Sequence, residues 1–246
     1  MTTRFQEKVR CAVCNKKSTF TIIGSTNEFG SPDLDTRPAE MLRSTIFEWV
    51  QRCPKCGYCN SDISTPPSAP SIATAVVKSP EYTLQLNDPT YPDLANSFLC
   101  MGLIEEKSGN YAEAAWSLIH ASWSCDDANL PGPAKACRIK ASQMIDTALD
   151  NGQQFSEQEG VETVLQVDLL RRAGLRTEAQ QLISAKHAAI TDDIISKILL
   201  FQDALLKNGD ESCRTIDDAL RFSDQGTSGG SLTPGWNART ARQSRT

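Results

Sequence analysis

The stretch Gln51-Arg52-Cys53-Pro54-Lys55-Cys56-Gly57-Tyr58 decides how the N-terminal part of this chain folds. Two cysteines separated by two residues lie on one tight turn, so both thiolates can face a single metal ion. Gly57 stands where such a turn needs backbone freedom and amide hydrogens directed at sulfur. A second turn of this kind, Cys11-Ala12-Val13-Cys14, precedes it by 38 intervening residues. The pattern predicts a tetrahedral site made by Cys11, Cys14, Cys53 and Cys56.

Four thiolate ligands are typical of a structural zinc ion, because they leave no open position for a catalytic water. A region of about 60 residues buries too little apolar surface to be secure alone. Structural zinc contributes roughly 10–16 kcal/mol of apparent binding energy to such a fold. We therefore predict one zinc ion per chain. Cys59 stays an alternative ligand, because Cys56-x-x-Cys59 is also an allowed pair, and a redox dithiol is a competing interpretation.

Composition favours a globular protein with an uneven charge distribution. The 246 residues are 39% hydrophobic and carry a net charge of -5. No apolar run is long enough for a membrane span, and the N-terminus lacks a secretory signal, so we expect a cytoplasmic protein with no membrane partner. Residues 1–60 carry nine Lys/Arg against six Asp/Glu, whereas residues 61–222 carry 13 against 23. The N-terminal region is therefore mildly basic and the rest of the chain acidic.

The chain divides at a proline-rich segment. Before it, the β-branched and aromatic stretches Ser18–Ile23 and Thr45–Gln51 predict two strands, which would bring the two cysteine turns together as a hairpin does. Residues 65–80 contain Pro66, Pro67, Pro70 and Pro80 and predict an extended connector that limits contacts between its neighbours. The predicted domains are a zinc ribbon at 1–64, the connector at 65–80, a helical domain at 81–222 and a disordered tail at 223–246.

The helical domain shows a repeated pattern of start and stop signals. Capping residues, prolines and glycines delimit apolar stripes with a period of 3.6 residues. The expected helices begin near positions 92, 110, 133, 156, 177, 191 and 211, with short connections between them. The fold class is therefore mainly α, with a small N-terminal β zinc ribbon.

The stretch Phe98–Ala121 resembles a tetratricopeptide repeat (TPR), a pair of antiparallel helices that pack closely. Gly102 and Ala114 take its small positions, while Tyr111 and Leu118 fill the gap between the helices. Glu105 and Asp126 depart from the pattern, and a weaker copy centres on Gly174. The resemblance implies a TPR-like helical repeat, and a generic helical bundle is the alternative.

The two cysteine turns, the loop Ser31-Pro32-Asp33-Leu34-Asp35-Thr36-Arg37-Pro38 and the repeat-like helices together resemble a family of uncharacterised bacterial proteins. This family is known as domain of unknown function 2225. The resemblance covers roughly residues 8–205 and implies a zinc ribbon joined to helical repeats. It implies no activity.

A protein–protein interaction scaffold without catalytic activity is the function these features favour. In the repeats resembled, the first helix of each pair lines a groove, and its basic side chains would suit an acidic protein or peptide. The alternative is that Arg171 and Arg172 complement the C-terminal dipole of their helix. The sequence leaves the oligomeric state open. The predicted partner-binding residues are Asn96, Leu99, Leu103, Lys107, Arg171 and Arg172, with Asp168 beside them.

Nucleic-acid binding through the ribbon is the alternative function, and catalysis has little support. The ribbon carries basic and aromatic residues that suit phosphates and bases. The histidines, His120 and His187, stand in predicted helices apart from any nucleophile motif. Trp116 and Trp123 share one helix face and are expected in the core. The residues expected to contact nucleic acid are Lys8, Arg10, Lys16, Lys17, Arg52 and Lys55, with Phe20, Phe47 and Trp49.

Overall fold

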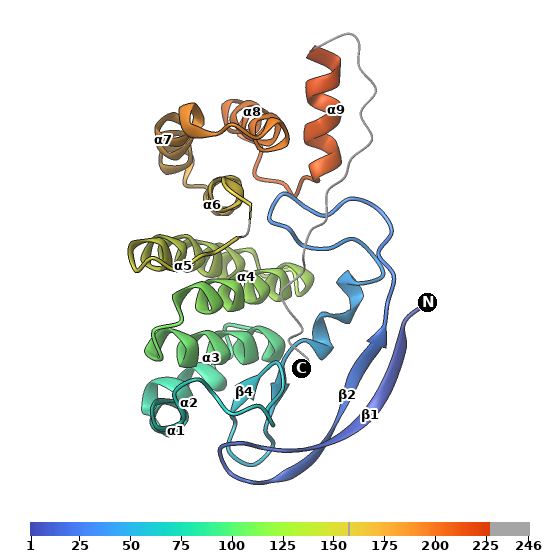
Figure 1. Cartoon of the computed structure of the whole chain (residues 1–246), viewed down its shortest axis with the longest axis vertical. Coiled ribbons are helices and arrows are strands. Elements are labelled where there is room, and N and C mark those ends of the chain that lie inside the picture. Colours follow the sequence, from blue (N-terminus) through green and yellow to red (C-terminus); the bar gives the residue numbers. More distant parts are fainter. Residues whose placement is uncertain (157, 227–246) are drawn as a thin grey trace. The chain divides into compact units, whose positions relative to one another are not determined.

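The computed structural model describes residues 1–156 and 158–226, and it confirms the mainly helical class (Figure 1). The chain forms two compact units. Unit 1 comprises residues 1–28 and 40–154, and unit 2 comprises residues 29–39 with the chain from Phe155 onward. In the part of the chain described, no helix is long and apolar enough to cross a membrane.

The strands of unit 1 form two small antiparallel hairpins. Strand β1 (Thr3–Arg10) pairs with β2 (Lys17–Ser25), and β3 (Gln51–Arg52) pairs with β4 (Cys59–Asn60). The predicted strand at 18–23 is confirmed as β2. Its partner β1 was not predicted, because charged residues interrupt its apolar positions.

The predicted strand at Thr45–Gln51 is wrong over most of its length, because residues 43–48 form the 3₁₀ helix η1 (Arg43–Glu48). Consecutive residues Thr45 and Ile46 are both buried, which an alternating strand with one solvated face does not allow. The Thr45 hydroxyl donates to the Leu42 carbonyl at 2.7 Å and accepts from Trp49 Nε1 at 2.8 Å. These local bonds favour a helical turn over an extended backbone.

The predicted extended connector is also largely helical. Helix α1 (Pro70–Val77) and helix α2 (Pro80–Leu86) each begin at a proline, whose missing N–H costs nothing in the first helical turn. The Ser79 side chain caps α2 by accepting from the Tyr82 N–H at 3.1 Å. The prolines at 70 and 80 therefore start helices, and the prediction of an extended connector is wrong at these positions.

Three long helices complete unit 1: α3 (Asp93–Lys107), α4 (Tyr111–Asp127) and α5 (Pro131–Asp150). They pack in chain order, α3 on α4 and α4 on α5. A Cβ atom at Gly102 would lie 3.1 Å from Ser117 Cβ and 3.4 Å from the Ala114 carbonyl oxygen. The close helix approach expected at Gly102 is therefore present. The assignment of this pair to the TPR class stays a prediction.

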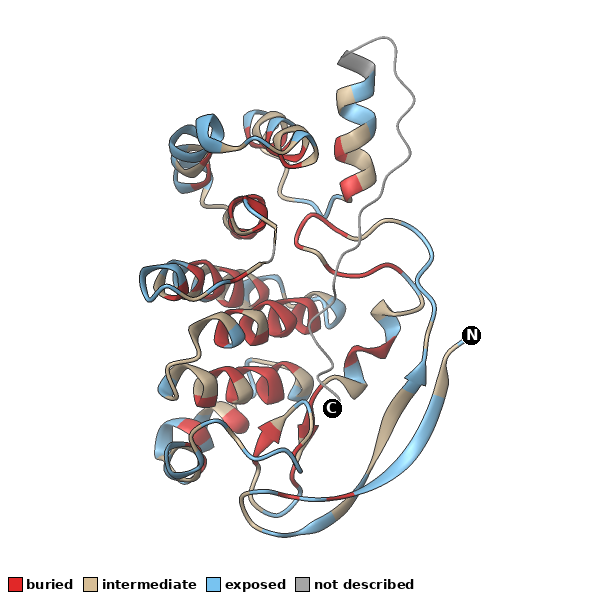
Figure 2. Cartoon of the chain, viewed as in Figure 1, coloured by how far each residue is buried: buried red, intermediate tan, exposed pale blue. Residues whose placement is uncertain are grey.

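The ribbon and the helices of unit 1 share one core, so the chain does not divide at residues 65–80. The Tyr82 hydroxyl of α2 donates to the Gly57 carbonyl at 2.9 Å and accepts from the Cys59 N–H at 3.1 Å. The Trp49 ring meets His120 of α4 edge-on, with ring centroids 5.3 Å apart. Buried positions accordingly extend from β3 and β4 into α3 and α4 (Figure 2). The predicted scarcity of contacts across the connector is wrong.

Unit 2 contains helices α6 (Val161–Ala173), α7 (Arg176–Lys186), α8 (Asp193–Asn208) and α9 (Ile216–Gly226), with the short 3₁₀ helix η2 (His187–Ala189) between α7 and α8. Leu34 of the segment 29–39, here called the strap, is buried among their apolar side chains. Helix α9 includes the first four residues of the predicted disordered tail. The rest of that tail, residues 227–246, lies outside the described residues.

Candidate metal centre

The two cysteine turns have the same backbone hydrogen bonds. In the first, the Cys11 N–H donates to the Lys16 carbonyl and the Asn15 N–H to the Cys11 carbonyl, both at 2.9 Å. In the second, the Cys53 N–H donates to the Tyr58 carbonyl at 2.8 Å and the Gly57 N–H to the Cys53 carbonyl at 2.9 Å. Each turn is thus closed at both ends by a main-chain bond.

A left-handed residue follows the second cysteine of each turn. Asn15 has a φ of 61° and Gly57 a φ of 76°. Glycine adopts this conformation without steric cost, and asparagine is among the side chains that tolerate it best. The sequence signal at Gly57 was legible, whereas Asn15 carries the same backbone role without a glycine to mark it.

Each turn belongs to a different hairpin. The first connects β1 to β2, whose last pair before the turn is Arg10 with Lys17. The second connects β3 to β4, where Arg52 pairs with Cys59. The expectation that strands inside the 15–52 segment would bring the two turns together is therefore wrong. Additional support for the first turn comes from Ile63, whose carbonyl accepts from the Ala12 N–H at 2.8 Å.

The four predicted sulfur atoms meet in one cluster. Cys11 Sγ lies 3.7 Å from Cys56 Sγ, and Cys14 Sγ lies 3.6 Å from Cys53 Sγ. All four lie within 4.8 Å of one another. Four sulfurs at 2.3 Å from one tetrahedral ion are about 3.8 Å apart. Cys11, Cys14, Cys53 and Cys56 could therefore hold a metal ion.

The surroundings of Cys11, Cys53 and Cys56 shift the pKa values of their thiols in different directions. Burial raises the pKa of Cys11 and of Cys56. Burial also opposes ionisation of Cys53, but the backbone N–H groups of Cys56 and Lys55 stabilise its thiolate and lower its pKa to about 7.

Cys59 lies outside the four-sulfur cluster. Its thiol donates to the Gly57 carbonyl at 3.2 Å, and burial raises its pKa to about 11. A protonated, buried thiol behaves as a small core side chain. The alternative in which Cys59 replaces one of the ligands does not match this arrangement.

The predicted partner-binding residues are placed differently from one another. Asn96 is buried, and its amide accepts from Gln85 Nε2 at 3.0 Å and donates to the Asp88 carbonyl at 2.8 Å. Leu99 is buried, Leu103 is half-buried, and the exposed Lys107 lies 3.6 Å from Glu81. Only the last two of these α3 side chains offer surface to a partner.

The two predicted partner-binding arginines lie in unit 2, and both have hydrogen-bond or ion-pair partners within the protein. Arg171 is buried, bonds Asp168 at 2.7 Å, and donates to the carbonyls of Asp210 and Ser212 at 2.6 and 2.9 Å. Arg172 lies 2.6 Å from the buried Asp35 of the strap. These contacts explain the positions of both arginine side chains without an external protein or peptide partner. Whether such a partner binds any of the six predicted residues stays untested. The alternative that both arginines complement the dipole of their helix does not predict these side-chain and carbonyl contacts.

His120 and the aromatic rings around it form a largely buried cluster in unit 1, whereas His187 and Phe47 are exposed. His120 is buried among Trp49, Phe98 and Trp123, and its ring centroid lies 4.9 Å from that of Trp123. Trp123 is in the core as predicted, and Trp116 is half-buried. Sequence reasoning missed this cluster, because Trp49 was expected on a strand.

Comparison with known proteins adds no assignment to these observations. No family model, no curated protein and no solved structure matches the chain. The resemblance to domain of unknown function 2225 therefore stays a prediction that rests on the motifs themselves.

Proposed function

We propose that this chain is a zinc-stabilised interaction protein with no catalytic activity of its own. The observation that carries the proposal is the exposure of the β1–β2 hairpin, which grows directly from the first cysteine turn. In β1 only Val9 is buried, and β2 has no buried residue (Figure 2). An isolated hairpin of two strands is marginal in water. A metal-anchored hairpin that the protein leaves exposed is best explained as a binding element.

Zinc is the ion that suits this donor set best. Four soft thiolates at tetrahedral spacing favour zinc over the hard cations, which prefer oxygen ligands. The main-chain bonds of both turns hold the cysteines of each pair on one side of the turn, as a shared ion requires. Since all four positions are protein sulfur, the ion would act by stabilising the ribbon, and it would not activate water.

The helical part of unit 1 would serve as the scaffold for this element. We propose a TPR-like role for the α3–α4 pair, supported by the close approach at Gly102. The rings of Trp49 and His120 lie close enough to join the ribbon to that scaffold. A partner bound at the hairpin would therefore meet a surface fixed in position.

The test is a capture experiment with the purified, tagged full-length chain, followed by separate identification of bound protein and bound nucleic acid. The wild-type protein should retain a specific bound protein or nucleic acid. Cys53→Ser should lose it together with the metal, because the ribbon loses its anchor. The matched control is Cys213→Ser, at an exposed cysteine outside the metal cluster, which should capture like wild type. Equal capture by all three proteins, or none by wild type, would overturn the proposed function.

A further inference from the structure

We infer that the β1–β2 hairpin binds double-stranded DNA, with one face of this hairpin in the major groove. The inference rests on the proposed function, whose partner class it names. The face in question is here called the basic face. It is defined by six residues from the middle of the hairpin and from its end next to the cysteine turn: Gln6, Lys8, Arg10, Lys17, Thr19 and Thr21.

The strand register places these six side chains together. Gln6 pairs with Thr21, Lys8 with Thr19 and Arg10 with Lys17, and directly opposed residues point to the same side of a hairpin. The Gln6 side chain donates to the Thr21 hydroxyl at 2.9 Å, across the same pair. Alternate residues of the strands, including Glu7 and Phe20, point to the other side. The one carboxylate of the two strands is thus excluded from the basic face.

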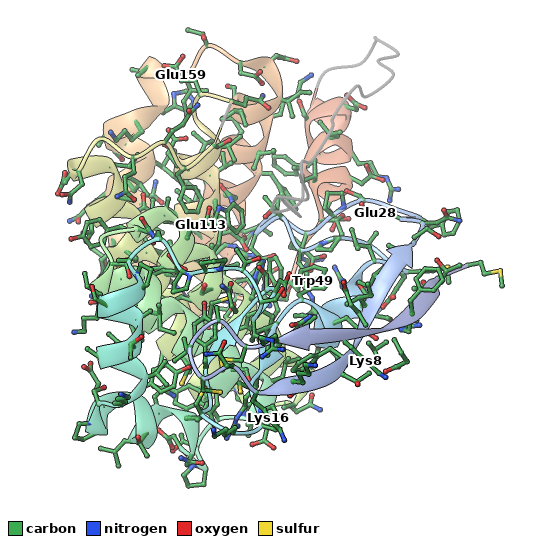
Figure 3. The ribbon with its side chains drawn as sticks, turned by 60° about the horizontal axis from the view of Figure 1, so that its bottom comes forward. Lys8, Lys16, Glu28, Trp49, Glu113 and Glu159 are labelled. Atoms are coloured by element: carbon green, nitrogen blue, oxygen red, sulfur yellow. The ribbon has the colours of Figure 1, made fainter. Side chains whose placement is uncertain are left out.

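The cations of this face are available to a ligand. Lys8, Arg10 and Lys17 are exposed, and none makes an ion pair among the described residues. Lys16 and Lys55, one on each cysteine turn, are likewise exposed and without an ion pair in the described part of the chain. Figure 3 labels Lys8 on the hairpin and Lys16 at its turn. These five cations, which have no ion pair with any described residue, form a local basic surface in a chain of net charge -5.

The shape of the hairpin suits the major groove. That groove is about 12 Å wide and admits a two-stranded β-ribbon. Side chains two residues apart on one strand are separated by about 7 Å, and the two strands by about 4.8 Å. The ribbon can therefore enter the groove with its central side chains on base edges and its lysines near the phosphates.

The composition of the basic face favours DNA over a protein partner. Protein interfaces depend on apolar or aromatic anchors at their centre. The six positions contain none; the next pair on the same side is Arg4 with the half-buried Ile23, at the end of the hairpin held by η1. Arginine, lysine, glutamine and threonine are the side chains that contact base edges and phosphates in the major groove.

The hairpin is held at both ends, which reduces the entropic cost of binding. At its base lies the cysteine turn of the metal centre. Toward the other end, Arg4 Nε lies 2.7 Å from a Glu48 carboxylate oxygen of η1. The basic face between these two attachments would meet DNA without prior folding.

The test is fluorescence anisotropy of a labelled mixed-sequence duplex with the metal-loaded full-length protein over a salt series. Wild type should bind with a log–log salt slope of about -3 or steeper, because each phosphate contact contributes about -0.9. Lys8→Glu/Arg10→Glu should weaken binding at least about tenfold, since it removes two cations and adds two carboxylates. Metal content should equal that of wild type, which separates a lost contact from a lost fold.

The matched control is Lys78→Glu/Lys140→Glu, which makes the same charge change at two exposed lysines, one directly after α1 and one in α5. It should change affinity less than about threefold, as expected for a remote alteration of net charge. Equal losses in the two double variants, or no salt-dependent binding by wild type, would overturn the inference. Competition by single-stranded DNA as effective as by duplex would overturn the groove placement. Capture of protein alone in the experiment above would remove DNA as the partner while leaving the interaction function standing.

Discussion

At the residue scale, the candidate metal centre depends on which cysteines share the cluster and which one does not. Cys56 and Cys59 follow the same two-residue spacing as the other pairs, so spacing alone cannot rank them. The backbone decides, because the left-handed turn at Gly57 directs the Cys59 thiol to the Gly57 carbonyl.

The first prediction concerns metal content. Cys14→Ser should reduce bound zinc from about one ion per chain to well below half, because three thiolates bind zinc less tightly than four. Cys59→Ser is the control and should keep the full metal content, since its hydroxyl can still reach the Gly57 carbonyl. Elemental analysis of the freshly purified proteins measures both. Normal zinc in Cys14→Ser would show that the cluster is not the binding site.

A second residue-scale prediction concerns the helix contact at Gly102. Gly102→Leu should lower the free energy of unfolding of unit 1 by about 2–3 kcal/mol, because the side chain cannot fit against Ser117 and the Ala114 carbonyl. Gly132→Leu is the matched control at an open helical position, where an added Cβ meets nothing within 4 Å. Chemical denaturation followed by tryptophan fluorescence reports mainly this unit, which contains three of the four tryptophans of the chain: Trp49, Trp116 and Trp123. Coincident midpoints for Gly102→Leu and wild type would contradict the close packing.

At the scale of elements, the strap is the segment whose role sequence reasoning did not foresee. Its main chain is bonded to the approach to α9, with the Leu34 N–H on the Arg214 carbonyl at 2.8 Å and the Ile216 N–H on the Pro32 carbonyl at 3.0 Å. Its Asp35 meets Arg172 of α6. The acidic ligand expected for this arginine is thus supplied by the chain's own loop.

The strap leads to a third prediction. Asp35→Ala should destabilise unit 2 by about 3–5 kcal/mol, because it removes the fully buried carboxylate that pairs with the largely buried Arg172 guanidinium. Glu211→Ala removes a more exposed pair with Arg176, 3.7 Å apart, and should cost under about 1 kcal/mol. Hydrogen exchange of α6 and α8 measures the difference. Unchanged protection in Asp35→Ala would mean that the strap does not stabilise this unit.

The Asp210 carboxylate, in the turn after α8, leads to the prediction that the stability of the protein falls at low pH. Burial opposes ionisation of Asp210, but bonds from Ser212 and Arg214 lower its pKa from 3.8 to about 2. A lowered folded-state pKa adds stability that is present above pH 3.8 and is lost as pH falls towards 2. Asp210→Asn should therefore cost about 1–2 kcal/mol at neutral pH, after allowance for solvent screening, and nearly nothing near pH 2. A variant deficit that is the same at both pH values would contradict this origin.

At the scale of the whole molecule, the ribbon belongs with α1–α5 in one unit. Tyr82 and Trp49 bring side chains of the ribbon and the helices into contact. Loss of the metal should consequently reach beyond the ribbon.

The fifth prediction is that chelating the metal lowers hydrogen-exchange protection in α2 and in the first turns of α3, as well as in β3 and β4. The physical reason is that the Tyr82 hydroxyl then loses a fixed Gly57–Cys59 segment to bond. Helix α8, in unit 2, is the internal control. Loss of protection confined to the ribbon would restore the picture of an independent N-terminal domain.

The sequence by itself determined the four metal-ligand candidates and the order of the long helices. Cys-x-x-Cys spacing is a local property of a tight turn, and caps with a 3.6-residue period act within single helices, so both are legible without the fold. The same locality made the close contact at Gly102 predictable, because the two helices that meet there are neighbours in the chain.

Only the tertiary structure decided the division into units and the roles of Trp49, Asp35 and Arg171. Each depends on groups far apart in sequence: Asp35 meets Arg172, Trp49 meets His120, and Arg171 donates to the Asp210 carbonyl. Local propensity favoured a strand at residues 45–51, but the burial of both Thr45 and Ile46 favours a 3₁₀ helix there. A buried charge or aromatic ring is placed by its partner, and the partner's position is a property of the folded chain.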